Sequence, residues 1–196
     1  MSEQAEAWAG DFGNEYAKRS PGDAVANKHF FIRALAKTVN INTAIEFGCG
    51  VGRNLQALST GNIKLAGVEI NHAAAFEARI YGPIFVASMV DWKGKGQYDL
   101  AFTKGLLIHI PPPELPRAYD VLYQASRKYI LIAEYFAPVL TEIEYRGRRD
   151  MLWKGPHAYD MLDRYPDLKL LDYGFVSKRD PYPQDDLNWW ILEKRP

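Results

Sequence analysis

The sequence predicts an α/β fold of the Rossmann-like type, with a mostly parallel sheet of seven strands that ends in an antiparallel hairpin. Three observations support this. Short β-type runs alternate with longer helical stretches. Several of these runs are continuously apolar over four or five residues, as is typical of strands covered on both faces. The last two runs are joined by a proline-containing segment too short for a helix, so we expect them to pair antiparallel.

The expected strands all follow residue 40, at 43–47, 64–69, 84–87, 99–104, 129–134, 168–176 and 188–194. Helical candidates lie between them, at 53–59, 73–80, 113–125 and 157–165. Pro113 suits the first turn of the third candidate, whose apolar residues recur at helical spacing at Leu115, Ala118, Val121, Leu122 and Ala125. Two earlier helices, around 3–18 and 24–38, are expected over the carboxyl edge of the sheet, where ligands bind in such folds.

The composition is that of a soluble globular protein. The 196 residues suit one domain, 1–196, in which 1–40 form the cap helices and 41–196 the Rossmann-like core. The 24 basic and 24 acidic side chains cancel, which disfavours a nucleic-acid partner. Cys49 is the single cysteine, and no Cys/His spacing indicates a metal site. No signal peptide or membrane span is recognisable, so we expect a cytoplasmic protein. The oligomeric state stays open.

The most informative segment is IEFGCGVGRN, at 45–54. It follows an expected strand and opens an expected helix, the context that a cofactor-binding turn requires. A dinucleotide turn, G-x-G-x-x-G, would place a third glycine at position 53. Here that position is Arg53, and the glycines are Gly48, Gly50 and Gly52. Glu46 opens the turn and would repel a pyrophosphate, whereas it is compatible with the sulfonium and amino groups of S-adenosylmethionine (SAM).

The pattern E-x-G-x-G-x-G resembles motif I of the class I SAM-dependent methyltransferases, which implies that Glu46 and the three glycines contact this cofactor. The alternative is a tight strand–helix turn with no ligand. Glu69 follows Gly48 by 21 residues, at the end of the second expected strand. A carboxylate at this place accepts hydrogen bonds from ribose hydroxyls. Asp91 follows the third strand, where the class I resemblance implies contact with the adenine amino group, or else it is a solvated loop residue.

The fourth expected strand leads into TKGLLIHI, at 103–110, which matches the fourth class I motif. The resemblance implies that Lys104 and the residues after it run beneath the methionine part of the cofactor, and that His109 lies close to the transferred methyl group. The imidazole of His109 can take a proton from a hydroxyl or amine; the alternative is a hydrogen-bonded core histidine. Enzymes that methylate base nitrogens carry [DNS]-P-P-[FYW] here. Ile110-Pro111-Pro112-Pro113 lacks the polar and aromatic residues of that motif.

Glu134, at the end of the fifth expected strand, is a second candidate base or an orienting group. About 20 residues without clear periodicity follow it, which indicates a functional loop over 135–155. We expect Tyr135 and Tyr145 to bind substrate, together with Arg146 and Arg148. Guanidinium groups present a fork of donors to a carboxylate or phosphate. The alternative is a solvated basic loop.

Aromatic residues also fall at roughly helical spacing near the amino terminus. Trp8 and Phe12 suit packing of a cap helix onto the domain. Tyr16 and Arg19 have polar tips, and we expect them to reach the carboxylate of the cofactor.

The chain as a whole resembles a small clade of methyltransferases associated with pseudaminic acid biosynthesis. The resemblance rests on FGNEY (12–16), EFGCGVGRN (46–54), TKGLLIHI (103–110), EY (134–135), YRG (145–147), YPDLKLLDYGFVSKRD (165–180) and PQDDLNWWILEK (183–194). Arg19-Ser20 departs from the Arg-Asn expected in this family. The family implies a small acidic substrate, a nonulosonic acid or its nucleotide-linked form. It does not establish which atom, oxygen or nitrogen, receives the methyl group.

Two other functions are compatible with the sequence. An NAD(P)-dependent reductase would also use Glu69, although the third glycine is misplaced for it. A non-catalytic SAM-binding module would keep the glycine turn without using His109 or the arginines.

Overall fold

The computed structural model describes the chain except for residues 1–2, 20–22, 95, 97 and 196. Its centre is a seven-stranded sheet with the order β3-β2-β1-β4-β5-β9-β8. The strands are β1 (Thr43–Phe47), β2 (Lys64–Glu69), β3 (Ile84–Val86), β4 (Tyr98–Lys104), β5 (Ser126–Glu134), β8 (Leu168–Val176) and β9 (Leu187–Lys194). The first five pair in parallel, and β9 pairs antiparallel with both β5 and β8. This confirms the predicted sheet and its terminal hairpin.

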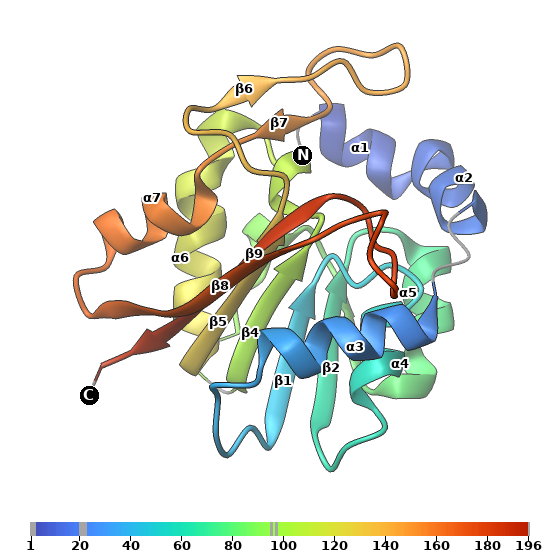
Figure 1. Cartoon of the computed structure of the whole chain (residues 1–196). Coiled ribbons are helices and arrows are strands. Elements are labelled where there is room, and N and C mark those ends of the chain that lie inside the picture. Colours follow the sequence, from blue (N-terminus) through green and yellow to red (C-terminus); the bar gives the residue numbers. More distant parts are fainter. Residues whose placement is uncertain (1–2, 20–22, 95, 97, 196) are drawn as a thin grey trace.

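Helices cover both faces of the sheet (Figure 1). They are α1 (Glu3–Ala9), α2 (Asp11–Arg19), α3 (Ala24–Ala34), α4 (Arg53–Leu58), α5 (His72–Ala78), α6 (Leu115–Ala125) and α7 (His157–Arg164). Short 3-10 turns add η1 (Arg79–Tyr81), η2 (Met89–Asp91), η3 (Leu107–His109) and η4 (Pro112–Glu114). No helix in the described ranges is long and apolar enough to cross a membrane.

The alternation of side chains along each central strand produces two hydrophobic clusters, one on each face. Along β1, Ile45 and Phe47 pack with α6 and α7, whereas Ala44 packs with α3 and α4. All three side chains are fully buried. Parallel strands covered on both faces must be apolar at nearly every position, and among the four buried residues of β1 the one exception is Glu46. That exception lies next to the candidate site.

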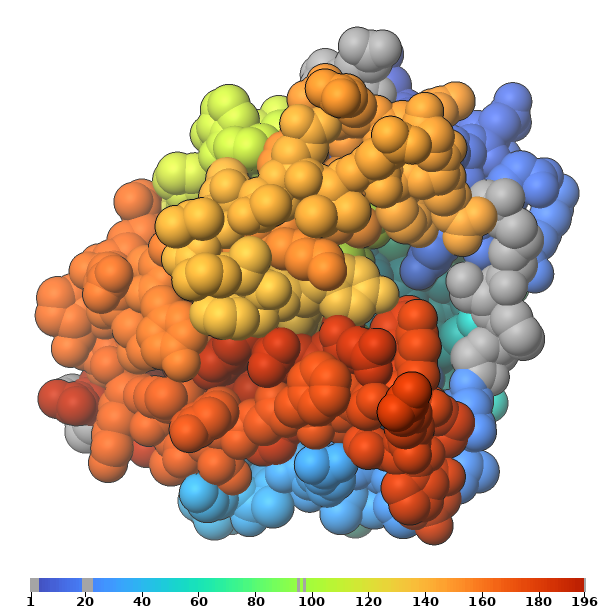
Figure 2. Space-filling model, turned by 45° about the horizontal axis from the view of Figure 1, so that its top comes forward, coloured from blue at the N-terminus to red at the C-terminus, as the bar shows by residue number. Residues whose placement is uncertain are grey.

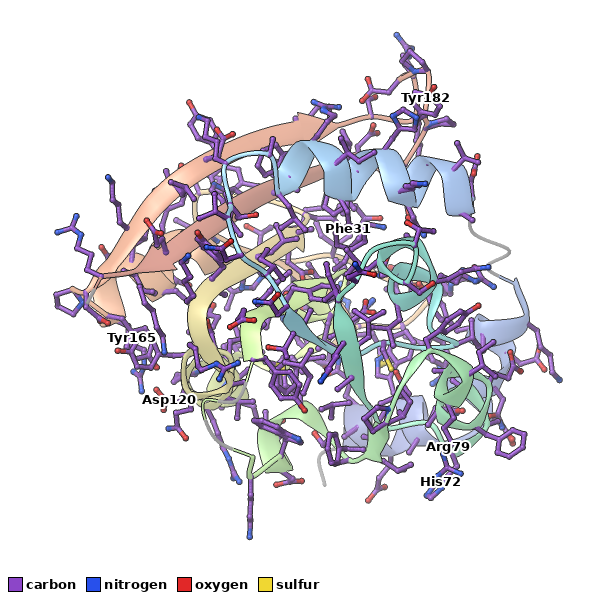
Figure 3. All side chains as sticks on the ribbon, turned by 90° about the horizontal axis from the view of Figure 1, so that it is seen from below. Phe31, His72, Arg79, Asp120, Tyr165 and Tyr182 are labelled. Carbon is purple, nitrogen blue, oxygen red and sulfur yellow. The ribbon has the colours of Figure 1, made fainter. Side chains whose placement is uncertain are left out.

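The second amino-terminal helix differs from the sequence-based expectation. We expected the helix after residue 24 over the carboxyl edge, but α3 lies along one face of the sheet (Figure 1). Phe30 and Phe31 are buried, and Phe31 lies between α3 and the sheet (Figure 3). Its ring centroid is 5.5 Å from that of Phe102 in β4. The apolar stripe of α3 therefore decided its position. Only its amino-terminal end, with Asp23 and Asn27, reaches the candidate site.

The first expected helix, 3–18, is divided into α1 and α2 at Gly10. Glycine in a helix interior costs about 0.5–1 kcal/mol relative to alanine, and Asp11 supplies the acidic first turn that favours a new start. The two short helices lie over the carboxyl ends of β1 and β2 (Figure 1).

The segment expected as an irregular loop over 135–155 contains a small hairpin of β6 (Thr141–Glu142) and β7 (Trp153–Lys154). A tight turn lies within it, because Tyr145 and Arg148 exchange both backbone hydrogen bonds. Its central residues, Arg146 and Gly147, have φ of 54° and 74°, the conformation typical of a two-residue hairpin turn.

Asn71 connects the sheet to the amino-terminal helices. Its Oδ1 accepts a hydrogen bond from the amide of Ala74 at 2.9 Å and so caps α5. Its Nδ2 donates to Asn14 Oδ1 at 2.8 Å and lies 3.4 Å from the carbonyl oxygens of the break between α1 and α2. The side chain is 3% exposed.

Replacing Asn71 with alanine is expected to lower the free energy of unfolding by about 1–3 kcal/mol, because the variant loses a helix cap and a buried hydrogen bond. Urea denaturation followed by circular dichroism measures this change. The matched control is Asn62→Ala, at an exposed turn. Equal loss in the two variants would show that Asn71 does not anchor these helices.

Candidate cofactor and acceptor site

A cavity of about 570 Å³ lies at the carboxyl ends of β1, β2, β3 and β4. The parallel strands point their carboxyl ends to one edge, and ligands bind in this crevice in open α/β sheets. Three further segments complete its wall: α1 and α2, the amino-terminal end of α3, and the β8–β9 loop through Lys178, Gln184 and Asp185. In the space-filling view, the teal residues of the sheet edge are visible in a hollow between the 135–155 insertion and the β8–β9 loop (Figure 2).

The glycine turn forms the floor of one part of this cavity. Gly48, Gly50 and Gly52 have φ of 70°, 53° and 84°, all in the left-handed region that favours glycine. A Cβ on Gly50 would meet no atom within 4 Å, so the turn is open to the cavity there. A Cβ on Gly52 would lie 2.7 Å from the Tyr81 ring and 3.1 Å from the backbone of Ala78. Gly52 therefore serves close packing of α4 against the end of α5, and it does not line the cavity.

The amides of this turn are already used within the protein. Gly48 and Cys49 donate to the carbonyl of Val68, and Gly52 donates to Cys49. The amide of Gly50 donates to Glu69 Oε2 at 2.8 Å. A pyrophosphate-binding turn needs such N–H groups free for the ligand. In this turn, four of the five amides of residues 48–52 already donate hydrogen bonds within the protein.

Glu69 lies at the end of β2 and lines the cavity. Its two oxygens accept from the amides of Gly50 and Asn71, each at 2.8 Å. The side chain is 8% exposed, and burial raises the pKa of its carboxyl above the ordinary value despite these hydrogen bonds. Two backbone donors fix the carboxylate, and its remaining lone pairs are available for hydroxyl donors of a ligand.

Glu46 and Lys104 lie deeper. Glu46 is fully buried, and burial raises its pKa to about 8. Its Oε1 accepts from Asn54 Nδ2 at 2.6 Å, while Oε2 has no hydrogen-bond partner among the described residues. Burial lowers the pKa of Lys104, whose Nζ donates to Asn27 Oδ1 at 3.3 Å. Lys104 and Asn54 line the cavity, whereas Glu46 supports it from below.

His109, on η3, closes the opposite end of the cavity. Its ring lies between those of Trp8 and Tyr145, with centroids 4.6 and 5.2 Å away. The Nδ1 atom is 2.7 Å from the carbonyl oxygen of Met151. Burial lowers the pKa of His109 to about 4, so the imidazole is neutral at physiological pH.

Glu134, the second candidate base, does not line the cavity. It is fully buried, and its carboxylate accepts from the amides of Leu106 and Leu107 at 3.0 Å and from Ile108 at 3.5 Å. Burial raises its pKa to about 7. These contacts hold the backbone that leads to His109, as expected of an orienting group at Glu134.

Besides Glu46, Gly52 and Glu134, five further predicted residues lie outside the cavity lining. Asp91 is exposed and lies 3.4 Å from Arg117, whereas Ser88 and Met89, just before it, line the cavity. Tyr135, Tyr145, Arg146 and Arg148 belong to the insertion.

The two arginines sit on the outside of an aromatic wall. The guanidinium of Arg146 lies 5.4 Å from the Tyr145 ring, and that of Arg148 lies 5.3 Å from the Phe12 ring. These rings in turn pack against His109 and Trp8. The insertion therefore reaches the site through its aromatic side chains.

At the amino-terminal side, Tyr16 lines the cavity, and its ring lies 5.2 Å from that of Trp8. Arg19 ends α2, and its side chain lies outside the described part of the structure.

Sequence reasoning missed several lining residues. Three of them are the amide side chains of Asn27, Asn71 and Gln184, which belong to no recognised motif. They reach the site from elements far apart in the chain. Only Gln184 gave a usable signal, since its segment belongs to the carboxyl-terminal stretch most specific to the family resemblance. Within the described ranges, no group of three or more His, Cys, Asp or Glu side chains is arranged to hold a metal ion.

Several solved structures with the same architecture are methyltransferases. A Burkholderia thailandensis 1,6-didemethyltoxoflavin-N1-methyltransferase matches with a TM-score of 0.78 at 14% identity, over 99% of this chain and 90% of its own. The Synechocystis PCC 6803 magnesium protoporphyrin IX methyltransferase matches with 0.71 at 15% identity, over 99% and 98%. A SAM-dependent methyltransferase from Leishmania major gives 0.73 at 16% identity, over 98% and 87%. The chain has the class I methyltransferase fold.

The sequence matches no protein-family model and no curated protein. The class I methyltransferase fold is therefore established by the structure, at identities of 14–16% that carry no information about substrate.

The buried carboxyl of Glu46 makes the free energy of unfolding depend measurably on pH. The pKa in the native state, about 8, lies above the ordinary value of 4.5. The native state thus holds a proton that the unfolded chain has lost, and the free energy of unfolding falls as pH rises through this range. The side chain in Glu46→Gln cannot ionise, so the free energy of unfolding of this variant is expected to fall less steeply with rising pH than that of the wild-type protein.

Urea denaturation of the ligand-free protein between about pH 5 and about pH 8 measures the slope. Glu77→Gln, at an exposed position of α5, is the matched control. A slope in Glu46→Gln as steep as that of the control would show that Glu46 is ionised in the native protein.

Proposed function

We propose that this protein is a SAM-dependent methyltransferase that transfers the methyl group to an oxygen or nitrogen of a small polar, acidic molecule. One observation carries the choice of cofactor: the amide of Gly50 donates to Glu69 instead of remaining free for a phosphate. The same contact fixes a carboxylate at the place where adenosine-binding sheets recognise ribose. Two of these solved neighbours contain the cofactor or its product, S-adenosylhomocysteine in the Burkholderia enzyme and SAM in the Synechocystis enzyme, which supports this cofactor.

The residues present fit SAM on three counts. Gly50 leaves open space for a ligand against the turn. The acidic side chains of Glu46, Asp185 and Glu134 lie near the ammonium of Lys104 and favour its charged form against the effect of burial. Lys104 can therefore meet the carboxylate of the methionine part, with Tyr16 beside it on the cavity lining. Asp91 would have to leave Arg117 to reach an adenine.

When bound, SAM supplies an electrophilic methyl group on its sulfonium. The protein then has to place the acceptor in line with this group, and positioning can contribute roughly 7–11 kcal/mol. His109 is neutral and lines the cavity, so it can take the proton that a hydroxyl or amine loses. Glu134 does not line the cavity, and it would support the reaction by holding the amides of 106–108.

A small acidic acceptor is the finer part of the proposal. The Burkholderia neighbour binds 1,6-didemethyltoxoflavin, which supports a small-molecule acceptor. Arg146 and Arg148 add positive charge outside the aromatic wall, next to the acceptor end of the cavity. The family resemblance points to a nonulosonic acid or its nucleotide-linked form. Label transfer from methyl-labelled SAM to these sugars, followed by mass spectrometry, tests the acceptor.

Cofactor binding is tested first, by calorimetry with SAM and with NADH. SAM is expected to bind and NADH to give no heat, since four of the five amides of the turn already donate within the protein and are not free for a pyrophosphate. Glu69→Ala should weaken SAM binding by about tenfold to a hundredfold through lost hydrogen bonds to a charged acceptor.

Gly50→Ala provides an independent check at the same turn. Its Cβ would project into the open space of the cavity, so SAM binding should be lost, while the left-handed conformation costs about 1–2 kcal/mol of stability. Glu77→Ala is the exposed control. Binding of NADH but not of SAM would replace the proposal with the reductase alternative.

Catalysis is tested with His109→Asn, whose side-chain amide can still donate to the carbonyl of Met151 but offers no basic nitrogen. Turnover should fall by about 10²–10⁴-fold, with SAM affinity nearly unchanged. Label transfer measures the first quantity and calorimetry the second. Unaltered turnover would remove His109 from the mechanism, and the absence of any transfer by the wild-type protein would favour a non-catalytic SAM-binding module.

A further inference from the structure

The hydrogen bond of His109 determines which of its ring nitrogens carries the proton. Nδ1 lies 2.7 Å from the carbonyl oxygen of Met151. A carbonyl only accepts, so Nδ1 must donate. A neutral imidazole has one N–H, which leaves Nε2 with a free lone pair. No described group of the protein hydrogen-bonds Nε2, and the ring borders the cavity.

The carbonyl of Met151 is itself held in place. Gln4 of α1 donates to it from Nε2 at 3.2 Å, and Gln4 is 6% exposed. Met151 and the two residues that follow it are buried, with exposed fractions of 6% for Met151, 4% for Leu152 and 7% for Trp153. Trp153 continues into β7, which pairs with β6. Three segments distant in sequence therefore meet at one oxygen atom: α1, η3 and the 135–155 insertion.

The remaining contacts of His109 restrict its motion without offering another hydrogen bond. Trp8 and Tyr145 pack on the ring at interplanar angles of 53° and 56°. The backbone amides of the preceding residues are fixed by Glu134. With ring position, backbone and Nδ1 partner all determined, one tautomer is selected.

We propose that the main-chain carbonyl of Met151, anchored by Gln4, holds His109 in the Nδ1–H tautomer and so turns it into a proton acceptor toward the cavity. The inference rests on the proposed function, since it assigns how the base of that reaction is prepared. Gln4 and Met151 are positioning residues, and His109 is the group that would touch the acceptor.

The chemistry needs this tautomer. As the bond from the acceptor oxygen to the methyl carbon forms and the sulfur–methyl bond breaks, the acceptor proton moves to Nε2. The resulting imidazolium donates through Nδ1 to the Met151 carbonyl, which stabilises the charge as the oriented acceptor does in a catalytic triad. The Nε2–H tautomer would present a donor to the acceptor and could take no proton at that atom.

The tautomer is directly observable by long-range ¹⁵N–¹H NMR on the full chain, without any ligand. Free histidine in water favours the Nε2–H form, so an Nδ1–H signal requires a specific acceptor. The chain has four histidines, and loss of one signal set in His109→Asn assigns the relevant ring. We expect a protonated Nδ1 and a bare Nε2 for His109 at neutral pH. A protonated Nε2, or a doubly protonated ring, would overturn the proposal.

The role of Gln4 is tested with Gln4→Leu, which keeps the side-chain size and removes the donor to Met151. The His109 signals should move from the single Nδ1–H pattern toward a mixture of both tautomers. Gln56→Leu, at an exposed position of α4, is the matched control and should keep the wild-type pattern. An unchanged His109 spectrum in Gln4→Leu would exclude the anchoring role. If Gln4→Leu does not fold, the wild-type spectrum still decides the tautomer.

Failure of this inference is distinguishable from failure of the proposed function. SAM binding measured by calorimetry on the same samples reports on the cofactor alone. SAM binding with a protonated Nε2 overturns the tautomer assignment and leaves the methyltransferase proposal standing. A protonated Nδ1 and a bare Nε2 in a protein that does not bind SAM would support the tautomer assignment and overturn the methyltransferase proposal.

Discussion

The carboxylate of Glu69 is the interaction on which the site depends. It accepts from Gly50 and from Asn71, and so joins the glycine turn after β1 to the turn after β2. Asn71 passes this connection on, through Asn14 and the cap of α5, to the amino-terminal helices. One buried carboxylate thus fixes the shape of the turn and the position of its cover. The desolvation that this requires is offset by two backbone donors at 2.8 Å.

A second buried carboxylate that accepts from backbone amides supports the other end of the cavity. Glu134 is buried at the end of β5 and receives the amides that lead into η3. Glu46, at a central position of β1, is held by Asn54 and lies close enough to influence Lys104. Buried carboxyls in a parallel sheet are costly, and burial raises the pKa of each of the three. All three lie at or near the carboxyl ends of their strands, at the edge of the sheet where the cavity opens.

The seven strands of the main sheet could be predicted from the sequence to within three residues, because continuous apolar runs bounded by glycine and charge have few other solutions. The residues on the glycine turn and at the end of β2 could be placed for the same reason, since the chain reverses immediately after each strand. The two-residue strands β6 and β7 could not be predicted, because they contain no apolar run. Asp91 shows the limit of this reasoning. Its distance from the strand is suitable, but one short 3-10 turn directs its carboxylate toward Arg117 and brings Ser88 and Met89 to the cavity.

The sequence by itself determined the layers, the seven strands with their antiparallel end and the acidic glycine turn, since these follow from local periodicity and from spacing along one strand–turn–helix unit. Only the tertiary structure decided which groups meet across the cavity. The Met151 carbonyl is 42 residues from His109 and 147 from Gln4. No local pattern encodes such a meeting, because a backbone carbonyl is present in every residue and acquires its role from the packing that surrounds it.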